Sequence, residues 1–161
     1  MSAHEKQLRN VLGRFATGVC VVASVNSEGK PIGMTINSFA SVSLSPSLVL
    51  WSIKRDSLCY PLFADAGAYS VSVLTGDQVE ISNRYARAGD HLMQKGDYVI
   101  SDRGVPYIKD SLAHFECESW QQYQAGDHDI LVASVVEFCN NMDEEPLIFY
   151  SGGYRALQLS A

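Results

Sequence analysis

Hydroxyl and amide side chains recur in one short and otherwise apolar segment of the N-terminal half. Residues 33–43 read GMTINSFASVS, a pattern typical of extended chain. Several fixed hydrogen-bonding groups beside an apolar face suit a flat heterocycle with ring carbonyls and N–H groups, such as the isoalloxazine ring of a flavin. A β-hairpin with solvated Ser and Thr side chains on its outer face explains the same pattern. Both interpretations stand on these residues alone.

A second polar segment combines two cations with two hydroxyl groups. Residues 52–57 read SIKRDS and follow a strand-like run, immediately before a short predicted helix. Lys54 and Arg55 beside these hydroxyls, near a helix N-terminus, suit the binding of a phosphate group. A solvated loop in which Asp56 or Ser57 caps the helix is the equal alternative.

Two segments nearer the C-terminus add aromatic and basic side chains. His128 follows a Gly-Asp turn at the start of an apolar run, where loop ends commonly place a side chain beside a ligand. Residues 151–155 read SGGYR: the glycines allow close approach of the backbone to a ligand, and Tyr154 and Arg155 offer stacking and anion contacts. A surface histidine and a simple C-terminal turn are the plain alternatives.

The signatures of several common catalytic sites are missing. The sequence has no GxGxxG, GxxxxGK, HExxH or GxSxG pattern. Any nucleotide must therefore be held by a site of a non-Rossmann kind. We predict no metal site.

Strand patterns dominate the chain and must position these polar segments. An apolar run at 18–25, a turn cluster at 26–29 and a second run at 31–35 predict a β-hairpin. Further strand-like runs lie at 39–43, 48–54, 68–74, 112–121, 128–138 and 147–150. About eight strands in one small domain favour a closed or nearly closed barrel, because closure removes exposed strand edges.

An amphipathic helix is expected at the N-terminus. Apolar residues at positions 8, 11, 12 and 15 have the spacing of one helix face. Ser2 and Glu5 fit a capping box at its start, and Gly18 is expected to end it.

Two shorter helices are predicted between the strands. They lie near 58–64 and 77–86, the second opened by a capping box of Thr75 with Gln78. Residues 87–110 are rich in Gly and Asp and predict a long excursion over the surface.

The composition bounds the class of protein. The 161 residues match one domain, 1–161, and 47% hydrophobic content is enough to bury a continuous core. Lys and Arg total 12 against 18 Asp and Glu, and the charge of −6 has the wrong sign for nucleic acid or anionic lipid. A polar N-terminus and the absence of a long apolar run predict a cytoplasmic protein without a membrane partner. Four scattered cysteines predict buried structural thiols.

Together these segments resemble the flavin reductase-like domain family, which includes reductase components of two-component aromatic monooxygenases such as the 4-hydroxyphenylacetate enzyme. The resemblance runs from about Leu8 to Leu157. It is carried, in order, by residues 13–19 (GRFATGV), 21–22, 33–35, 37–39, 41–44, Pro46, 84–86 (RYA), 126–128 (GDH) and 152–155 (GGYR). It implies a mainly β, FMN-binding split barrel with an N-terminal helix and short peripheral helices, assembled as a homodimer with flavin near the subunit interface.

The resemblance also implies where the ligands bind. The cofactor-binding residues are expected to be Thr35, Ile36, Asn37, Ser38, Ser41, Val42, Ser52, Lys54, Ser57, Arg84, Tyr154 and Arg155, with His128 as the catalytic residue. Within this set, Lys54, Ser57 and Arg84 are assigned to the flavin phosphate. His128, Tyr154 and Arg155 are assigned to the nicotinamide side. Two positions depart from the family pattern: Ile36 replaces a common small Ala, and 54–57 reads KRDS where Arg-Ser-Ser is usual.

The activity implied is flavin reduction by a nicotinamide cofactor. NADH or NADPH would transfer hydride from nicotinamide C4 to N5 of FMN or FAD, and a partner monooxygenase would receive the reduced flavin. The protein would chiefly align the two rings, because the redox chemistry belongs to the cofactors. One alternative is a flavin-binding or electron-transfer split-barrel protein without productive NAD(P)H turnover. Another is a heme-utilisation or pyridoxamine-phosphate-oxidase-like protein of the same fold.

Overall fold

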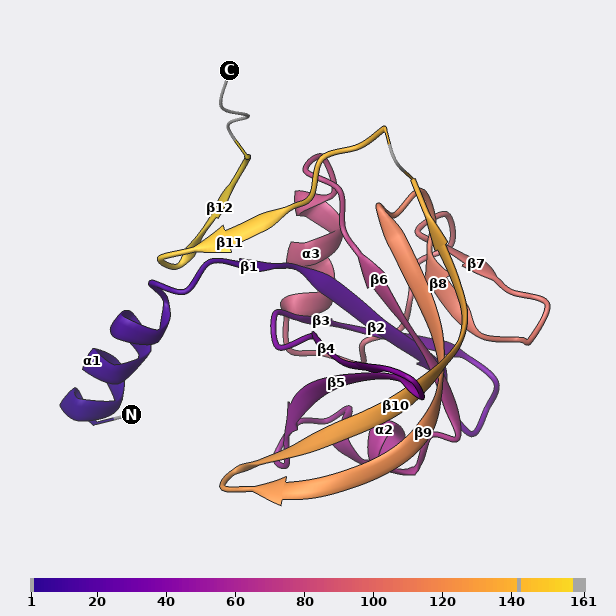
Figure 1. Cartoon of the computed structure of the whole chain (residues 1–161), viewed down its shortest axis with the longest axis horizontal. Coiled ribbons are helices and arrows are strands. Elements are labelled where there is room, and N and C mark those ends of the chain that lie inside the picture. The colour runs from indigo at the N-terminus through magenta and orange to yellow at the C-terminus, as the bar shows by residue number, and fades with distance from the viewer. Residues whose placement is uncertain (1, 142, 158–161) are drawn as a thin grey trace.

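The computed structural model describes residues 2–141 and 143–157, and most of its regular structure is β (Figure 1). The helices are α1 (Ala3–Leu12), α2 (Tyr60–Asp65) and α3 (Val79–Ala86). The strands are β1 (Thr17–Gly18), β2 (Cys20–Val25), β3 (Pro31–Ile36), β4 (Ala40–Leu44), β5 (Ser47–Lys54), β6 (Ala68–Val73), β7 (Tyr98–Ile100), β8 (Pro106–Ile108), β9 (Ala113–Ala125), β10 (His128–Asn140), β11 (Ile148–Tyr150) and β12 (Gly153–Arg155). In these two described ranges, none of the helices has both the length and the apolar character that a membrane crossing requires.

Antiparallel strands form one large curved sheet in the order β3-β2-β6-β9-β10-β5-β4. The predicted hairpin is confirmed as β2 and β3, in which Cys20 pairs with Ile36 and Val25 with Pro31. The long strands β9 and β10 run side by side within this sheet and extend as a hairpin to the lower left of the view (Figure 1). The mainly β expectation is therefore confirmed.

The inside of the curved sheet holds an aromatic core. On β5, side chains alternate so that Val49, Trp51 and Ile53 point inward and are buried. The Trp51 ring meets the rings of Phe63 and Tyr69 edge to face, at centroid distances of 5.3 and 5.8 Å. This core ties α2 to the sheet.

A second core covers the opposite face of β2. Val21 and Ala23 of that strand pack there with Leu74, Ile108 and Leu147, which are distant from β2 in the sequence. Because β2 is buried on both faces, its sequence is a continuous apolar run and does not alternate.

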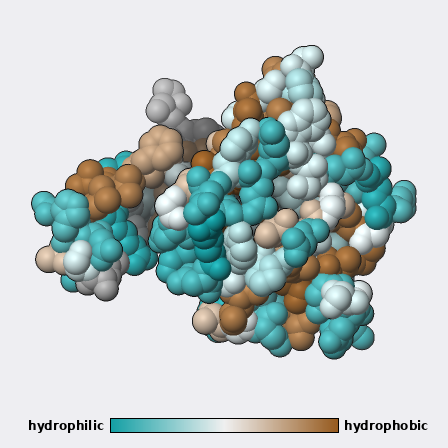
Figure 2. All heavy atoms as spheres, turned by 90° about the horizontal axis from the view of Figure 1, so that it is seen from below, coloured by the Kyte–Doolittle hydropathy of each residue, from teal (hydrophilic) through white to brown (hydrophobic). Residues whose placement is uncertain are grey.

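The N-terminal helix stands apart from this double core. Strands β1, β11 and β12 form a small separate sheet, and α1 projects beyond it (Figure 1). The same projection is seen in Figure 2, at the left. None of the α1 residues is buried, and Phe15, just after the helix, is 80% exposed. The predicted apolar stripe therefore exists, but none of its residues is buried against the rest of the described chain.

The predicted end of the first helix was wrong. The Ser2–Glu5 capping box is confirmed, but the helix ends at Leu12, and the Gly13 N–H donates to the Arg9 carbonyl at 3.0 Å. The chain then turns into β1, where Thr17 pairs with Phe149 of β11. Pairing with the distant strand β11 determines where the helix ends. The spacing of nearby apolar residues carries no information about that pairing.

Two other local predictions need correction. The Thr75–Gln78 box is only half formed: the Gln78 side chain accepts from the Thr75 N–H, but the Thr75 hydroxyl donates to Asp77. The segment 87–110 is not a bare surface excursion, because it contains the hairpin β7–β8 and buries residues such as Val105 and Ile108.

The cysteine prediction holds for three of the four thiols. Cys20, Cys59 and Cys117 are free and buried, and burial raises the pKa of the Cys20 thiol to about 12. Cys139 is free but exposed, because it lies on the outer part of β10 beyond the core. The prediction of a buried thiol was wrong for this residue.

Candidate functional site

A cleft of about 950 Å³ lies between the projecting N-terminal segment and the body of the protein. Figure 2 shows the projecting segment at the left, beside the body of the protein. The lining of the cleft comes from α1, β1, the end of β3, α3 and the β11–β12 turn: Arg9, Asn10, Leu12, Gly13, Arg14, Phe15, Thr17, Val19, Thr35, Ile36, Asn37, Ser82, Ala86, Phe149, Ser151, Gly152 and Tyr154. A volume of this size is typical of small-molecule sites.

The end of β3 brings three predicted residues to this cleft. Thr35 and Ile36 are its last two residues, and Asn37 follows directly. The Thr35 hydroxyl is already engaged, since it donates to the Ser82 carbonyl at 2.7 Å. Asn37 is exposed, and its side-chain amide makes no hydrogen bond with the described part of the chain. Asn37 therefore offers a free donor and a free acceptor beside the apolar Ile36 side chain.

The C-terminal segment and α3 build the opposite wall. The Tyr154 hydroxyl lies 2.7 Å from the Ser82 hydroxyl and donates to the Asn83 amide oxygen at 3.1 Å. The Tyr154 ring packs against Phe149 at a centroid distance of 5.7 Å. Tyr154 thus reaches the predicted site, but its polar end is occupied by α3.

Two cations in the cleft had no predicted role. Arg9 lies in the last turn of α1, and Arg14 lies in the turn that follows. The Arg14 guanidinium donates to the Tyr150 hydroxyl at 3.3 Å, and this bond lowers the pKa of Tyr150. The position of Arg14 within the GRFATGV segment was the one sequence feature that could have indicated this role. The spacing of residues alone does not distinguish a cation on a helix surface from a cation beside a cleft.

Other predicted residues gather at the neighbouring end of the large sheet, outside the cleft lining. The Ser38 hydroxyl and the Ser52 backbone bond each other at 3.1 and 3.2 Å. The Ser57 hydroxyl lies 3.8 Å from the Met34 sulfur and accepts from the Cys59 N–H. His128 pairs with Lys54 across β10 and β5. The chain step from Asn37 to Ser38 joins this cluster to the cleft.

The two basic residues of the 52–57 segment are each paired with a carboxylate. Lys54 contacts Asp56 at 2.7 Å, and both side chains are at least half exposed. Arg55 contacts Asp129 at 2.7 Å, with the Asp129 side chain only 4% exposed. Arg55 is therefore held by a buried carboxylate of the protein, whereas the exposed Lys54 pair can open at little cost.

Asp129 joins three elements around the first residues of β10. It accepts hydrogen bonds from Tyr60 of α2, Gln122 of β9 and Arg55 of the loop after β5. The bonds from Tyr60, Gln122 and Arg55 outweigh the effect of desolvation and lower the pKa of Asp129 to about 2. This carboxylate therefore positions the loop after Lys54 and the strand start that carries His128.

We expect Asp129→Asn to change how stability responds to acid. The pKa of Asp129 falls from 3.8 to about 2 on folding, so its contribution is complete above about pH 4 and lost as the pH falls toward 2. Wild type should therefore exceed the variant in stability at pH 6, and the gap should close between pH 4 and 2. Thermal melts across this range measure it, with Asp65→Asn, an exposed carboxylate of α2, as the charge-matched control. A gap that stays constant down to pH 2 would contradict the assignment.

Four predicted residues lie apart from both groups or turn away from them. Ser41 and Val42 are exposed on β4, and Arg84 forms an ion pair with Asp97, which also accepts from the Tyr85 hydroxyl. The Arg155 guanidinium folds back onto the Tyr154 carbonyl at 2.7 Å. Their roles in ligand binding stay predictions.

The His128 ring is partly exposed and bonded to its neighbour. Its Nδ1 lies 2.8 Å from an Asp127 carboxylate oxygen, and this bond lowers the pKa of Asp127. This bond holds the ring next to the turn between β9 and β10. The role of His128 in ligand binding also stays a prediction.

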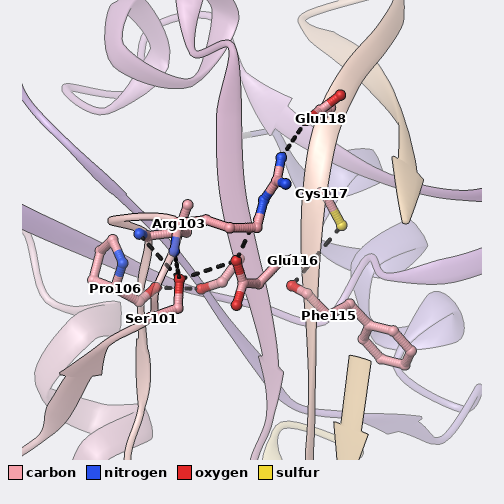
Figure 3. Close-up of polar contacts among 9 residues, drawn as sticks. Ser101, Arg103, Pro106, Phe115, Glu116, Cys117 and Glu118 are labelled. Atoms are coloured by element: carbon pink, nitrogen blue, oxygen red, sulfur yellow. Dashed lines mark hydrogen bonds and ion pairs between the residues drawn. The ribbon is translucent and has the colours of Figure 1, made fainter. Parts of the chain in front are cut away.

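A second cleft, of about 680 Å³, lies between the β7–β8 hairpin and the adjoining parts of β9 and β10. Figure 3 shows that Arg103 there reaches both Glu116 and Glu118, while the Ser101 hydroxyl donates to Glu116 at 3.0 Å. Asp102 and Glu137 also line it. Its one arginine is neutralised by carboxylates, so this cleft does not suit an anionic ligand.

The curved antiparallel sheet, with a cleft beside it, defines the class of protein as a β-barrel-like domain. Residues 12–158 match the family model described as flavin reductase like domain. The chain belongs to this family.

Relatives in this family share most of the length of the chain. The "FMN reductase (NADH) SmoA" of Agrobacterium fabrum is 44% identical over 151 residues, covering 94% of this chain and 85% of that protein. The structure of the Streptomyces globisporus C-1027 NADH:FAD oxidoreductase SgcE6 with NAD and FAD fragments superposes with a TM-score of 0.92 at 35% identity, covering 98% and 94% of the two chains. The structure of the styrene monooxygenase flavin reductase (SMOB) of Pseudomonas putida S12 superposes with a TM-score of 0.86 at 30% identity, covering 96% of this chain and 99% of that chain. The split-barrel expectation is thereby confirmed.

Proposed function

We propose that this protein is an NADH-dependent flavin reductase, which reduces FMN or FAD by hydride transfer from nicotinamide C4 to flavin N5. The observation that carries the proposal is the cleft itself, where a free amide and two arginines without carboxylate partners among the described residues lie beside apolar walls. Membership of the flavin reductase like family supports it. NADH is the named donor of the SmoA and SgcE6 proteins, which favours it over NADPH.

The residues around the cleft fit a flavin. The ring carbonyls and N3–H need fixed partners, and the exposed Asn37 amide can donate to one and accept from another. Ile36, Phe15 and Phe149 supply apolar surface for the ring faces. Toward Ser38, the sheet end offers the hydroxyl of Ser57 and the exposed Lys54 for a phosphate.

The flavin, when bound, supplies the hydride-accepting ring, and the side chains act by orientation. Asn37 would fix the edge of the ring, while Thr35, tied to Ser82, would hold the strand end rigid. His128 would bind the nicotinamide side, since its Nδ1 contact with Asp127 leaves Nε2 for a ligand. The proposed set of cofactor-binding residues is completed by Ser41, Val42, Arg84 and Arg155.

The test of the proposed function is the oxidation of NADH followed at 340 nm in stopped flow, with FMN, FAD or no flavin added. We expect oxidation with flavin and none without it. Flavin fluorescence lost on binding, but no NADH oxidation with either flavin, would favour the alternative of a flavin-binding module.

We expect Asn37→Ala to weaken flavin binding by about 0.5–1.5 kcal/mol, because an exposed amide that bonds the ring is removed. Fluorescence titration with FMN measures the change in Kd. Gln94→Ala, which removes an exposed amide outside the cleft, is the matched control. If the two variants have the same Kd, Asn37 does not contact the flavin.

We also propose a homodimer that passes reduced flavin to a monooxygenase. The exposed apolar stripe of α1, with Val11 and Leu12 each 64% exposed, supports a second copy of the chain as its cover. Light scattering of the wild type should give twice the mass of one chain. The variant Leu12→Glu should give the mass of a single chain. The proposed cytoplasmic location is supported by the free thiols of the four cysteines.

A further inference from the structure

The first cleft differs in charge from the rest of this acidic protein. The chain has 18 Asp and Glu residues, yet none of them is among the residues that line this cleft, whereas Arg9 and Arg14 are. The second cleft has the opposite character, with Asp102, Glu116 and Glu137 in its lining beside one arginine. A positively charged cleft on a protein of charge −6 indicates an anionic ligand.

Arg9 and Arg14 also differ from three other arginines of the described chain. Arg55, Arg84 and Arg103 each form an ion pair with a carboxylate. Neither Arg9 nor Arg14 forms one within residues 2–141 and 143–157. Their charges are therefore available to a ligand, without the cost of first breaking a pair.

Hydrogen bonds hold the segment that carries Arg14 against the β11–β12 turn. The Ser151 N–H of the β11–β12 turn donates to the Gly13 carbonyl at 2.9 Å, which ties the turn to the residue before Arg14. The Tyr150 hydroxyl occupies one N–H of Arg14 and leaves the remaining donors of its guanidinium free. Gly152, at φ 78°, lines the cleft without a Cβ.

We propose that Arg9 and Arg14 form a binding site for the diphosphate of a dinucleotide. Guanidinium groups bond phosphate oxygens in pairs, and two of them match the charge of a diphosphate. The proposal rests on the proposed function for the source of the ligand: NADH and FAD both contain a diphosphate, whereas FMN contains a single phosphate.

The direct test is calorimetric titration with ADP, which has the diphosphate but no redox ring. Wild type should bind ADP at millimolar concentration or below, and Arg9→Ala and Arg14→Ala should each weaken binding about tenfold, as expected for a charge-assisted hydrogen bond. Arg14→Lys should recover part of the loss, because it keeps the charge but not the paired donors. Lys6→Ala, which removes a cation of α1 outside the cleft, is the control and should bind like wild type.

Kinetics then identify the source of the diphosphate. With FMN as acceptor, NADH is the only dinucleotide present, and a tenfold rise in its KM for Arg14→Ala assigns the site to the donor. An unchanged KM together with a tenfold loss of FAD affinity assigns it to FAD. Wild type that fails to bind ADP, or arginine variants that match Lys6→Ala in every measurement, would overturn the proposal. If wild type shows no NADH oxidation but binds ADP through these arginines, the proposed function fails and the diphosphate site stands.

Discussion

Trp51→Ala should lower the free energy of unfolding by about 3–5 kcal/mol, the range for removing a buried aromatic side chain. Trp51 is fully buried, and its ring meets Phe63 and Tyr69 edge to face. The truncation leaves a cavity between α2 and the sheet that these rings cannot fill by small shifts, because protein cores are close-packed. Urea denaturation followed by circular dichroism measures the change.

The second tryptophan is the internal control for this result. Trp120 is 53% exposed on β9, so Trp120→Ala should change stability by less than about 1 kcal/mol. Trp51→Phe should recover part of the loss, since it keeps a ring against Phe63. If Trp51→Ala and Trp120→Ala had equal effects, the aromatic core would not be the main support of α2.

Leu147→Ala should cost about 2–5 kcal/mol of stability and also weaken flavin binding. Leu147 is 1% exposed in the second core, and its N–H donates to the Leu74 carbonyl at 2.9 Å. It directly precedes β11, whose Phe149 lines the cleft. Loosening this anchor should therefore displace one wall of the cleft as well as create a cavity.

The two effects of Leu147→Ala are separable by measurement. Urea denaturation reports the stability, and fluorescence titration with FMN below the unfolding transition reports the Kd. Leu44→Ala, at a side chain 93% exposed on β4, is the matched control and should leave stability almost unchanged. A stability loss with an unchanged flavin Kd would show that β11 does not position the flavin.

Local sequence patterns predicted most of the strands correctly. The apolar run before Asn26 and the turn that follows it specify the β2–β3 hairpin, because a turn sequence and two adjacent strands need no distant information. The strand-like run at 48–54 likewise corresponds to β5, Ser47–Lys54. The Ser2–Glu5 box identifies the start of α1 for the same reason.

The candidate site was predicted only in part. Thr35, Ile36, Asn37 and Tyr154 do line one cleft, while Ser38, Ser52, Lys54, Ser57 and His128 gather next to it. The polar character of 33–43 was visible in the residues, but the exclusive bonding of Thr35 to Ser82 was not. Hydroxyl groups that look equivalent in the sequence differ in their availability to a ligand, because some already form hydrogen bonds within the protein.

The sequence by itself determined the strand pattern, the helix start at Ser2 and the kinds of side chain available to a ligand, since these depend on neighbours along the chain. Only the tertiary structure decided which cations stay free. Arg55 is paired with Asp129, 74 positions away, while Arg14 contacts the Tyr150 hydroxyl and, in the part of the chain that the structure describes, no carboxylate. The charge that a ligand meets is what remains after such distant pairs have formed, and only folding brings their partners together.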